Sequence, residues 1–526
     1  MVVEERLELS DIQGAILPGF KKDHAAIISL RIDDVAGCKT WLRARAPEVA
    51  RADEVLAFNR LFKQIRMRRG GEALGPKAVW TSISFSADGL SLLRSRQEIE
   101  AAFEDAFFDG MFQSALGDPP PSRWAVGGTP DGVPHILVVI AADDPTHLAA
   151  AVARLDATIA ETVTGGKPAL RSMDTPQLGA TLTGALQGHE HFGFKDGISQ
   201  PAIRGVASED PQDFVDARRL ATDDANYELF AEPGRPLVWP GQFLIGYNRQ
   251  DRSDFLKPFT PFEPKVPWQR NGSYLVYRRL QQKVHAFWRF CTDGARVFSE
   301  QTGREVTPEA FASLLVGRWP SGAPLVRAPA ADDPDLAADN DVNNDFLFSD
   351  ATPTATLVDG TVPSSGLPPA RPDPNGHLCP FVAHIRKVNP RDDPTDTGGP
   401  RQTRTRLTLR RGIPYGPAKD PARLLEDDGV DRGLLFMSYQ GSIQNQFEFV
   451  VKTWVNLPNS PHDSDPPTGQ DPLIGQGSAP RFVRLPHDPD TADEKFTLPD
   501  ETWVVMTGGG YFFTPPVSAL SGALAE

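Results

Sequence analysis

The chain has 526 residues, 40% of them hydrophobic and 23% charged, and its formal net charge is −15 at pH 7. A chain of this length is too long to fold around a single hydrophobic core, so we expect two or more domains of roughly 100–200 residues each. A chain this acidic would repel the phosphates of DNA or RNA, which argues against a nucleic-acid partner. No run of about 18 apolar residues predicts a membrane span.

The three cysteines, Cys38, Cys291 and Cys379, lie far apart in the sequence. Without a CxxC pair, neither a structural zinc site nor an iron–sulfur cluster is expected, and no CxxCH motif offers a covalent attachment for haem. The first residues, MVVEERLELSDIQGAIL, show neither a basic segment followed by an apolar one nor a twin arginine. These features favour a cytoplasmic location, with export by another route left open.

In the first half of the chain, three apolar segments predict strands at residues 25–32, 77–86 and 135–142, and a helix is expected over 38–52. Asp144 followed by Pro145 predicts a helix N-terminus, since aspartate caps helices and proline suits the first helical position. The apolar residues that follow recur at helical spacing and predict one buried face: Leu148, Val152, Leu155, Ile159 and Val163.

The second half repeats this alternation of strand and helix patterns. Strands are expected at 243–247, 274–277, 434–439 and 502–506, and helices at 284–298 and 443–454. Strands mixed with helices and separated by long loops predict two α+β domains, with a boundary between about residues 205 and 240.

Three segments read as poorly structured. The stretch 328–380 is rich in proline, glycine and aspartate and predicts a surface insertion. A second such stretch begins at Asn459. The last residues, SALSGALAE, resemble a frayed end.

The segment HEHFGFKDGISQP contains the first candidates for chemistry. His189 and His191 are two residues apart, so on an extended segment both imidazoles would face one side, as metal ligands do; an ordinary loop is the alternative. Gly193 and Gly197 bracket Asp196, and glycines permit a positive φ and a close approach of the backbone to a flat ligand. A tight turn with no further role is the alternative.

The segment CPFVAHIRKVNPR places His384 in an apolar run, with Arg386 and Arg391 close behind. This pattern suits a haem, because iron takes an imidazole and the propionates take basic groups. A hydrogen-bonded core histidine is the alternative. In LTLRRGIPYGP, Arg410 and Arg411 follow a strand-like run. They indicate either a solvated face or a buried cation that stabilises charge on bound peroxide.

Together these three segments resemble the dye-decolourising peroxidase family, in the order in which the family has them. GFKDG matches the family's Gly-x-x-Asp-Gly motif, CPFVAHIRKVNPR its proximal-histidine segment and RRGIPYGP its distal-arginine segment. Supporting matches are DIQGAIL from Asp11, WPGQFLIGY from Trp239 and GLLFMSYQGSIQNQFEF from Gly433. The resemblance therefore covers almost the whole chain and is nearest to the longer members of the family.

The resemblance implies an α+β fold of two ferredoxin-like domains with antiparallel sheets and peripheral helices. Residues 1–225 would form the N-terminal domain, which carries the distal aspartate loop. Residues 226–526 would form a haem-binding domain with long loop insertions. The resemblance further implies one haem b per chain, with hydrogen peroxide and aromatic electron donors such as dyes and phenols as partners. The oligomeric state is left open.

By motif position, the resemblance implies that His384 is the proximal iron ligand, Asp196 the distal acid–base and Arg410 the distal arginine. It also implies a set of haem-binding residues: Gly193, Phe194, Gly197, Ile198, Leu434 and Phe436, with Arg386 and Arg391 as propionate partners. The rival interpretation is a non-enzymatic haem-binding or iron-release protein. Such a protein would need His384 but neither Asp196 nor Arg410.

Two finer expectations follow from the resemblance. The family often orients its proximal histidine through an acid after the Tyr-Gln strand; here that region reads Gln444-Asn445, so a neutral amide is expected and with it a higher iron potential. Because bulky dyes cannot enter a small distal pocket, the family relays electrons through surface tryptophan or tyrosine. Tyr415, five residues after Arg410, is the first candidate for such a relay.

Overall fold

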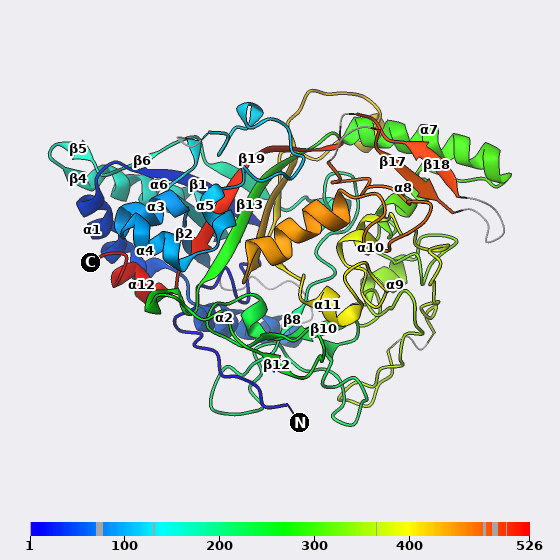
Figure 1. The fold of residues 1–526 in the computed structure, drawn as a ribbon, viewed down its shortest axis with the longest axis horizontal. Helices are drawn as coiled ribbons and strands as arrows, with labels where there is room; N and C mark the ends of the chain where they lie inside the picture. The colour runs from blue at the N-terminus through cyan, green and yellow to red at the C-terminus, as the bar shows by residue number, and fades with distance from the viewer. Residues whose placement is uncertain are drawn as a thin grey trace.

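The computed structural model describes residues 2–69, 77–129, 132–363, 366–476, 480–486, 493–500 and 502–526. Its centre is an antiparallel sheet of ten strands in which both halves of the chain take part (Figure 1). The first half contributes β1 (His24–Ile32), β2 (Val79–Phe85), β3 (Ile136–Ala142), β6 (Leu170–Ser172) and β7 (Gln177–Ala180). The second half contributes β13 (Ser273–Gln282), β14 (Leu409–Arg410), β15 (Ile413–Tyr415), β16 (Gly433–Gln440) and β19 (Val504–Thr514).

The two halves meet where the last long strand pairs with an early one. The strand order is β14-β16-β13-β19-β2-β3-β1-β6, with β15 beside β16 and β7 beside β1. Between β19 and β2 the register records one pair, Phe513 opposite Phe85, and both side chains are buried. Strands from the two predicted domains therefore form one continuous sheet, and the division at residue 225 stays a prediction.

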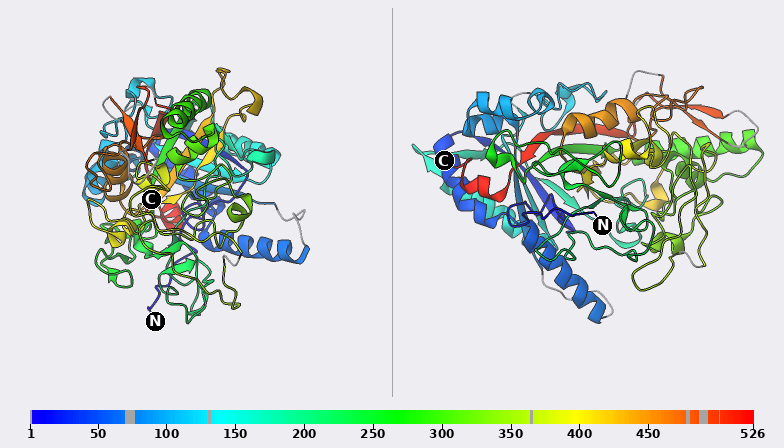
Figure 2. Two further views of the ribbon diagram at one scale, coloured as in Figure 1. Left: turned by 90° about the vertical axis from the view of Figure 1, so that its right-hand side faces the viewer. Right: turned by 60° about the horizontal axis from the view of Figure 1, so that its bottom comes forward.

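Helices cover the sheet and extend beyond it. Those of the first half lie together at one end of the molecule (Figure 1): α1 (Val35–Arg45), α3 (Ala87–Leu93), α4 (Arg96–Ala102), α5 (Asp105–Asp109) and α6 (Pro145–Glu161). The second half adds α7 (Val284–Thr302), α8 (Pro308–Val316), α9 (Pro334–Ala338), α10 (His384–Val388), α11 (Pro400–Arg404) and α12 (Val517–Ser521). The long helix α2 (Ala52–Arg69) projects from the body in both views of Figure 2.

Short paired strands lie outside the main sheet. They are β4 (Val163–Thr164) with β5 (Lys167–Pro168), β8 (Ala202–Ile203) and β9 (Phe230–Glu232) with β10 (Arg235–Val238), β11 (Arg249–Gln250) with β12 (Pro258–Phe259), and β17 (Phe482–Leu485) with β18 (Glu494–Thr497).

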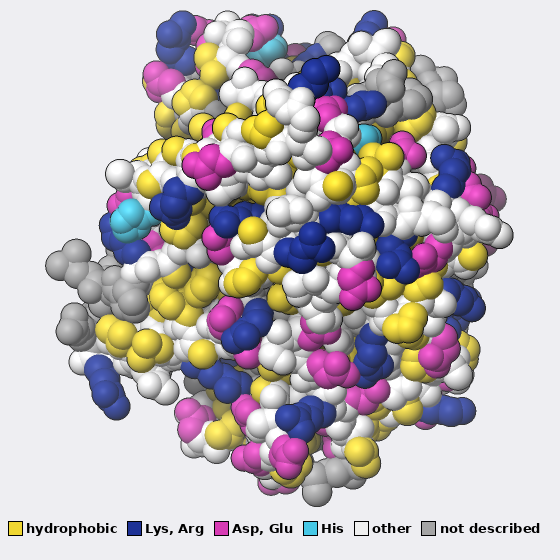
Figure 3. Space-filling model, turned by 90° about the vertical axis from the view of Figure 1, so that its left-hand side faces the viewer, with side chains coloured by type: hydrophobic (Ala, Val, Ile, Leu, Met, Phe, Trp, Pro, Cys, Tyr) yellow, Lys and Arg dark blue, Asp and Glu magenta, His cyan; other side chains and the backbone are white. Residues whose placement is uncertain are grey.

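On the face of the molecule drawn in Figure 3, basic and acidic side chains are interspersed among apolar ones.

Alternation along the strands produces two cores, one on each face of the sheet. In β1, Ile28 and Leu30 join the core under the helices, while Ile27 joins the opposite core. The second core is closed by the N-terminal segment, including Ile12 and Ile16, rather than by a layer of helices. Because both faces are covered, β3 is apolar and buried along its whole length.

Most of the predicted elements are confirmed, with differences that have local causes. The expected helix over 38–52 is divided, because α1 ends at Arg45 and Pro47 follows in a 3-10 turn. The segment 243–247 is not a strand: it is a buried turn region after Pro240, with Gly246 at φ 88°. The helix over 443–454 is present as two π-helical segments, η8 (Ile443–Glu448) and η9 (Val450–Val455).

Two segments expected to be loose are packed. The stretch 328–380 is not a mere surface insertion, because Leu336, Val342, Phe346 and Phe348 form a core of their own. The C-terminal tail is not frayed: it forms α12, its leucines are buried, and Arg43 of α1 donates a hydrogen bond to the carbonyl of Ala525. The tail thus belongs to the core of the first half.

We predict that Leu520→Ala destabilises the protein by roughly 2–5 kcal/mol, because Leu520 is fully buried in the core under α1 and the substitution leaves a cavity there. Urea unfolding followed by tryptophan fluorescence measures the change. Leu92→Ala is the matched control, since Leu92 is 41% exposed and should shift the midpoint little. Equal effects of the two substitutions would contradict a packed C-terminal tail.

Candidate functional site

The three motif segments line one cavity of 330 Å³. Asp196, His384 and Arg410 all contribute to its wall, although they are separated by up to 214 positions in the sequence (410 − 196). Much of the apolar part of the lining comes from β16, α10 and the π-helical segments. It includes Ile385, Val388, Leu434, Phe436, Phe447 and Leu473.

His384 is the first residue of α10, and a buried carboxylate holds its ring. Its Nδ1 lies 2.8 Å from Oδ2 of Asp471. The imidazole keeps 27% of its surface exposed in the cavity, while Asp471 is fully buried. Burial of the imidazole acts against its charged form, but the charge and hydrogen bond of Asp471 outweigh it and raise the pKa of His384.

Asp471 is itself fixed by the backbone. Its Oδ1 accepts hydrogen bonds of 2.9 Å from the N–H groups of Leu473 and Ile474. These bonds leave Oδ2 for the imidazole, so the ring is held with Nδ1 toward Asp471.

The expectation of a neutral amide beside His384 is wrong. Gln444 and Asn445 are exposed in the first turn of η8, where the Asn445 side chain bonds Ser442. The carboxylate comes instead from Asp471, in the second proline-rich stretch, which we expected to be poorly structured. No motif in the sequence around Asp471 indicated this contact.

The Asp196 loop is a closed hairpin. His189 and Lys195 form an antiparallel bridge, and the N–H of Asp196 donates to the carbonyl of Gly188 at 3.0 Å. Gly193 has φ 96° and Gly197 has φ 77°. A Cβ at either glycine would meet nothing within 4 Å, so the left-handed backbone, not a lack of space, requires glycine there.

Asp196 reaches into the cavity from this hairpin. Its side chain is exposed, and the N–H of Gly197 donates to its Oδ1 at 2.6 Å. Phe194, Gly197 and Ile198 also line the cavity. Gly193 is outside the lining that the described residues form and serves the turn instead.

Arg410 is held at the same end of the cavity by contacts with the segment after the hairpin. Its guanidinium donates to the carbonyl of Ser199 at 2.8 Å, and its N–H donates to Oε1 of Gln200 at 3.2 Å. In the sheet, Arg410 pairs with Ser438 of β16, the strand that supplies Leu434 and Phe436 to the cavity. Sequence neighbours of Asp196 thus fix the orientation of Arg410.

Comparison with known proteins decides the family. Over 536 aligned residues, the chain is 32% identical to the dye-decolorizing peroxidase msp1 of Mycetinis scorodonius, and the match covers 99% of this chain and 88% of that protein. The chain belongs to the dye-decolourising peroxidase family. The family model described as DyP dimeric alpha+beta barrel domain matches residues 11–167. The multifunctional dye peroxidase DyP2 of an Amycolatopsis species is 29% identical, with 97% of this chain and 95% of that protein covered.

Solved structures of dye-decolourising peroxidases share the fold. An ancestral D-type dye decolorizing peroxidase superposes with a TM-score of 0.75 at 30% identity, covering 99% of this chain and all of that one. A dye-decolorizing peroxidase in complex with 2,6-dimethoxyphenol gives a TM-score of 0.71 at 30% identity, again covering 99% of this chain. The predicted α+β fold and the predicted enzyme class, an oxidoreductase of a haem-dependent peroxidase family, are therefore confirmed.

Arg386, expected to bind a haem propionate, has a different place in this peroxidase. Its guanidinium is fully buried and is not among the described residues that line the cavity. It donates to the carboxylates of Asp393 (2.7 Å) and Asp373 (3.0 Å) and to the carbonyl of Cys379 (2.7 Å). The arginine neutralises two buried acids, and one of them, Asp373, accepts hydrogen bonds from the N–H groups of residues 377–379, the segment before α10.

Arg391 lines the cavity, and a second arginine that the motif search missed lies beside it. Arg318 and Arg391 both donate to Oδ1 of Asn344, at 3.0 and 2.6 Å. Their other recorded hydrogen bonds go to backbone carbonyls, so neutral oxygens surround both cations. Burial lowers the pKa of Arg318 to about 9 and that of Arg391 to about 10. Nothing in the sequence around Arg318 indicated that it lines the cavity.

The pair His189 and His191 does not form a metal site. His189 Nδ1 lies 3.0 Å from the carbonyl of Gln187, and His191 Nε2 lies 2.8 Å from the carbonyl of Tyr415. Within the described ranges, no cluster of histidine, cysteine or acidic residues is arranged to hold a metal ion. In those ranges there is also no helix with the length and apolar character needed to cross a bilayer.

Tyr415, the candidate for the electron relay, is buried beside the Asp196 hairpin. Its hydroxyl donates to Oδ1 of Asp431 at 3.0 Å, and the guanidinium carbon of Arg279 lies 4.3 Å from its ring centroid. Asp431 is half exposed and also ion-pairs with Arg279. Tyr415 thus lies one contact below the surface.

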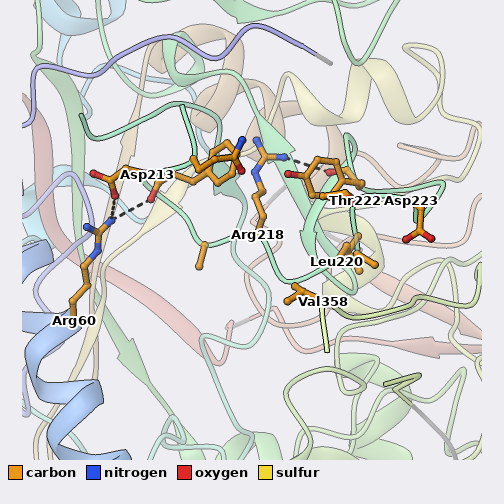
Figure 4. Close-up of a pocket in the computed structure, with 12 residues that line it drawn as sticks. Arg60, Asp213, Arg218, Leu220, Thr222, Asp223 and Val358 are labelled. Carbon is orange, nitrogen blue, oxygen red and sulfur yellow. Dashed lines mark hydrogen bonds and ion pairs between the residues drawn. The ribbon is translucent and has the colours of Figure 1, made fainter. Parts of the chain in front are cut away.

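A second pocket, of 660 Å³, opens on the surface and is separate from the motif residues (Figure 4). Its cations are already neutralised, because Arg60 pairs with Asp213 at 3.0 Å and Arg218 pairs with Glu4. Val358 and Leu220 form part of the same wall (Figure 4). None of the three motif residues lines this pocket.

We predict that Arg386→Met destabilises the haem-free protein by about 3–5 kcal/mol, because it leaves Asp373 and Asp393 buried without their cation. Urea unfolding measures the change. Arg296→Met, which removes an exposed helical ion pair with Glu300, should change stability by less than about 1 kcal/mol. A stable Arg386→Met protein that binds haem weakly would return Arg386 to the role of propionate partner.

Proposed function

We propose that this chain binds one haem b in the 330 Å³ cavity, reduces hydrogen peroxide there and oxidises aromatic donors such as dyes and phenols. The observation that carries the proposal is the meeting of three groups in one cavity: an imidazole held by a buried carboxylate, an exposed aspartate, and an arginine fixed by the aspartate's own loop. The complex of a relative with 2,6-dimethoxyphenol supports the phenolic donors.

The residues present fit a haem. Among the described residues, the recorded hydrogen bond of His384 is at Nδ1, which leaves Nε2 as the nitrogen for iron. Leu434, Phe436 and the other apolar residues suit the flat macrocycle. Arg318 and Arg391, whose recorded partners are neutral oxygens, suit its two propionates. When bound, the haem supplies the iron centre at which peroxide is reduced and to which donors return electrons.

Asp196 is the acid–base group of this reaction. With the haem in place, Asp196 would accept a proton from one oxygen of peroxide and pass it to the other, which would leave as water, while the haem would supply the two electrons of the reduction. Arg410 supplies a fixed positive charge that stabilises the charge separation as the O–O bond breaks.

Asp471 tunes the other side of the site. A carboxylate hydrogen-bonded to Nδ1 makes an imidazole more electron-rich and fixes the direction of its Nε2. It therefore favours the oxidised states of the metal that a peroxidase needs. The effect is opposite to that expected for Gln444 or Asn445 in this place.

Bulky donors react at the surface through Tyr415. On oxidation, its ring gives up an electron toward the cavity and its phenolic proton passes to Oδ1 of Asp431, so charge is conserved at the ring. The adjacent Arg279 cation disfavours a positively charged ring, which makes the proton transfer to Asp431 necessary.

We predict that Asp196→Asn slows the reaction with peroxide by about 100-fold or more in acid, because the amide cannot accept the proton. Stopped-flow recording of the absorption change after one equivalent of peroxide measures this rate. Asp223→Asn, an exposed aspartate of the surface pocket, is the matched control and should react at the wild-type rate. A near wild-type rate for Asp196→Asn would assign the main role to Arg410.

The same recording separates a peroxidase from a non-enzymatic haem carrier, the rival interpretation. A carrier would show a Soret band that depends on His384 but would not change rapidly on adding peroxide. The presence of Asp196 and Arg410 in the same cavity as His384 favours catalysis.

We predict that Tyr415→Phe lowers kcat/KM for a bulky dye and leaves the peroxide rate constant unchanged, because phenylalanine has no phenolic proton to pass to Asp431. Steady-state decolorisation and stopped-flow measurements on one preparation test both. Tyr227→Phe, in the surface pocket, is the control. Unchanged dye turnover in Tyr415→Phe would show that the relay uses another residue.

A further inference from the structure

Glu190 lies near the start of the Asp196 hairpin, and its carboxylate lies inside the turn. Oε2 accepts the N–H of Phe192 at 2.9 Å, and Oε1 accepts the N–H of Phe194 at 2.9 Å. The side-chain amide of Gln282 donates a third hydrogen bond, to Oε2. Two oxygens therefore satisfy three donors, two of which belong to the loop that carries Asp196.

The backbone closes around this carboxylate. The N–H of Glu190 donates to the carbonyl of Phe194 at 3.0 Å, and the N–H of Gly193 donates to the carbonyl of Glu190 at 2.9 Å. The amides of Phe192, Gly193 and Phe194 thus all donate to Glu190, either to its backbone carbonyl or to its side chain. No other described residue makes as many contacts with this turn among the recorded hydrogen bonds.

Two contacts connect the turn around the Glu190 carboxylate to the second half of the chain. Gln282 lies on β13, opposite Val504 of β19, so its bond to Glu190 joins the hairpin to the sheet. Phe192 stacks on Phe287 of α7, with ring centroids 4.4 Å apart. The hairpin is therefore fixed at both sides, by the sheet through Glu190 and by α7 through the aromatic pair.

We propose that Glu190 is a positioning residue for Asp196: its carboxylate holds the hairpin in the conformation that directs Asp196 into the cavity. This inference rests on the proposed function of Asp196. Without the two carboxyl oxygens of Glu190, the N–H groups of Phe192 and Phe194 lose their partners, and a shielded N–H without a partner is costly. The turn then opens toward water, and Asp196, two residues after Phe194, moves with it.

Burial shields Glu190 and raises its pKa to about 7, an effect that its three hydrogen bonds oppose and the nearby charge of Asp196 increases. A buried acid is retained at this position despite that cost. The loop geometry accounts for it, because no neutral side chain of this size offers two acceptor oxygens to two backbone donors.

Glu190→Gln is the decisive variant. The amide keeps the size of the side chain and one acceptor oxygen, but its NH₂ group faces a backbone donor. We expect hydrogen exchange of residues 189–196 in the haem-free protein to accelerate about tenfold, the effect of one lost charged hydrogen bond, with α7 (Val284–Thr302) unchanged. In the haem-loaded protein the rate constant for peroxide should fall about tenfold as well. Glu209→Gln, an exposed glutamate paired with Arg6, is the matched control and should change neither quantity.

The outcomes separate this inference from the proposed function. Unchanged exchange of residues 189–196 in Glu190→Gln overturns the inference, and so does faster exchange with an unchanged peroxide rate. A wild-type peroxide rate in Asp196→Asn instead overturns the proposed role of Asp196. If Glu190→Gln does not fold, Glu190→Asp, which keeps the charge but cannot span both donors, is measured in the same way. In the wild-type protein the amides of Phe192 and Phe194 must be protected; rapid exchange at both would overturn the inference without any variant.

Discussion

The antiparallel pairing of β19 with β2 is the contact on which the site depends. Phe513 opposite Phe85 joins the strands of the first half to those of the second, and both rings are buried where the halves meet. The Asp196 hairpin follows the last strand of the first half, whereas His384, Arg410 and most of the cavity lining belong to the second. A continuous sheet fixes the distance between these two groups of residues. A hinge between separate sheets would let Asp196 move away from His384, and displacements of about 1 Å matter greatly in catalysis.

Buried charge is the second constraint. Arg386 is neutralised by two acids, and Lys387 donates from Nζ to the carbonyls of Trp454, Leu457 and Ser460, with burial lowering its pKa to about 7. Arg386 and Lys387 are neighbours in the sequence, and their buried charges are compensated differently, that of Arg386 by carboxylates and that of Lys387 by backbone carbonyls. Both residues stabilise the segment around α10, the helix that begins at His384. By contrast, Arg318 and Arg391 have neutral partners, so their charge is left to act on whatever the cavity binds.

Much of this could be predicted from the sequence, because the informative features are local. Apolar alternation identified the long strands, and the run Asp144-Pro145 identified the start of α6, where the side chain of Asp144 accepts from Thr146. The motifs identified Asp196, His384 and Arg410, which share one cavity. Contacts across long sequence distances could not be predicted. Asp471 meets His384 from 87 positions away, and Arg318 is related to Arg391 only through Asn344. Residue type and spacing carry no trace of such pairs.

The place of β19 in the sheet also has a consequence for how the chain acquires its fold during synthesis. The strands of the first half leave the ribosome long before β19, which ends at Thr514 and pairs with the edge of β2. Until then β2 presents unpaired N–H and C=O groups, the feature that leads nascent chains to associate with one another. The tail arrives only afterwards, when α12 packs against α1. The sheet can therefore be completed only after almost the whole chain has been synthesised, and the edge of β2 stays open to other chains until then.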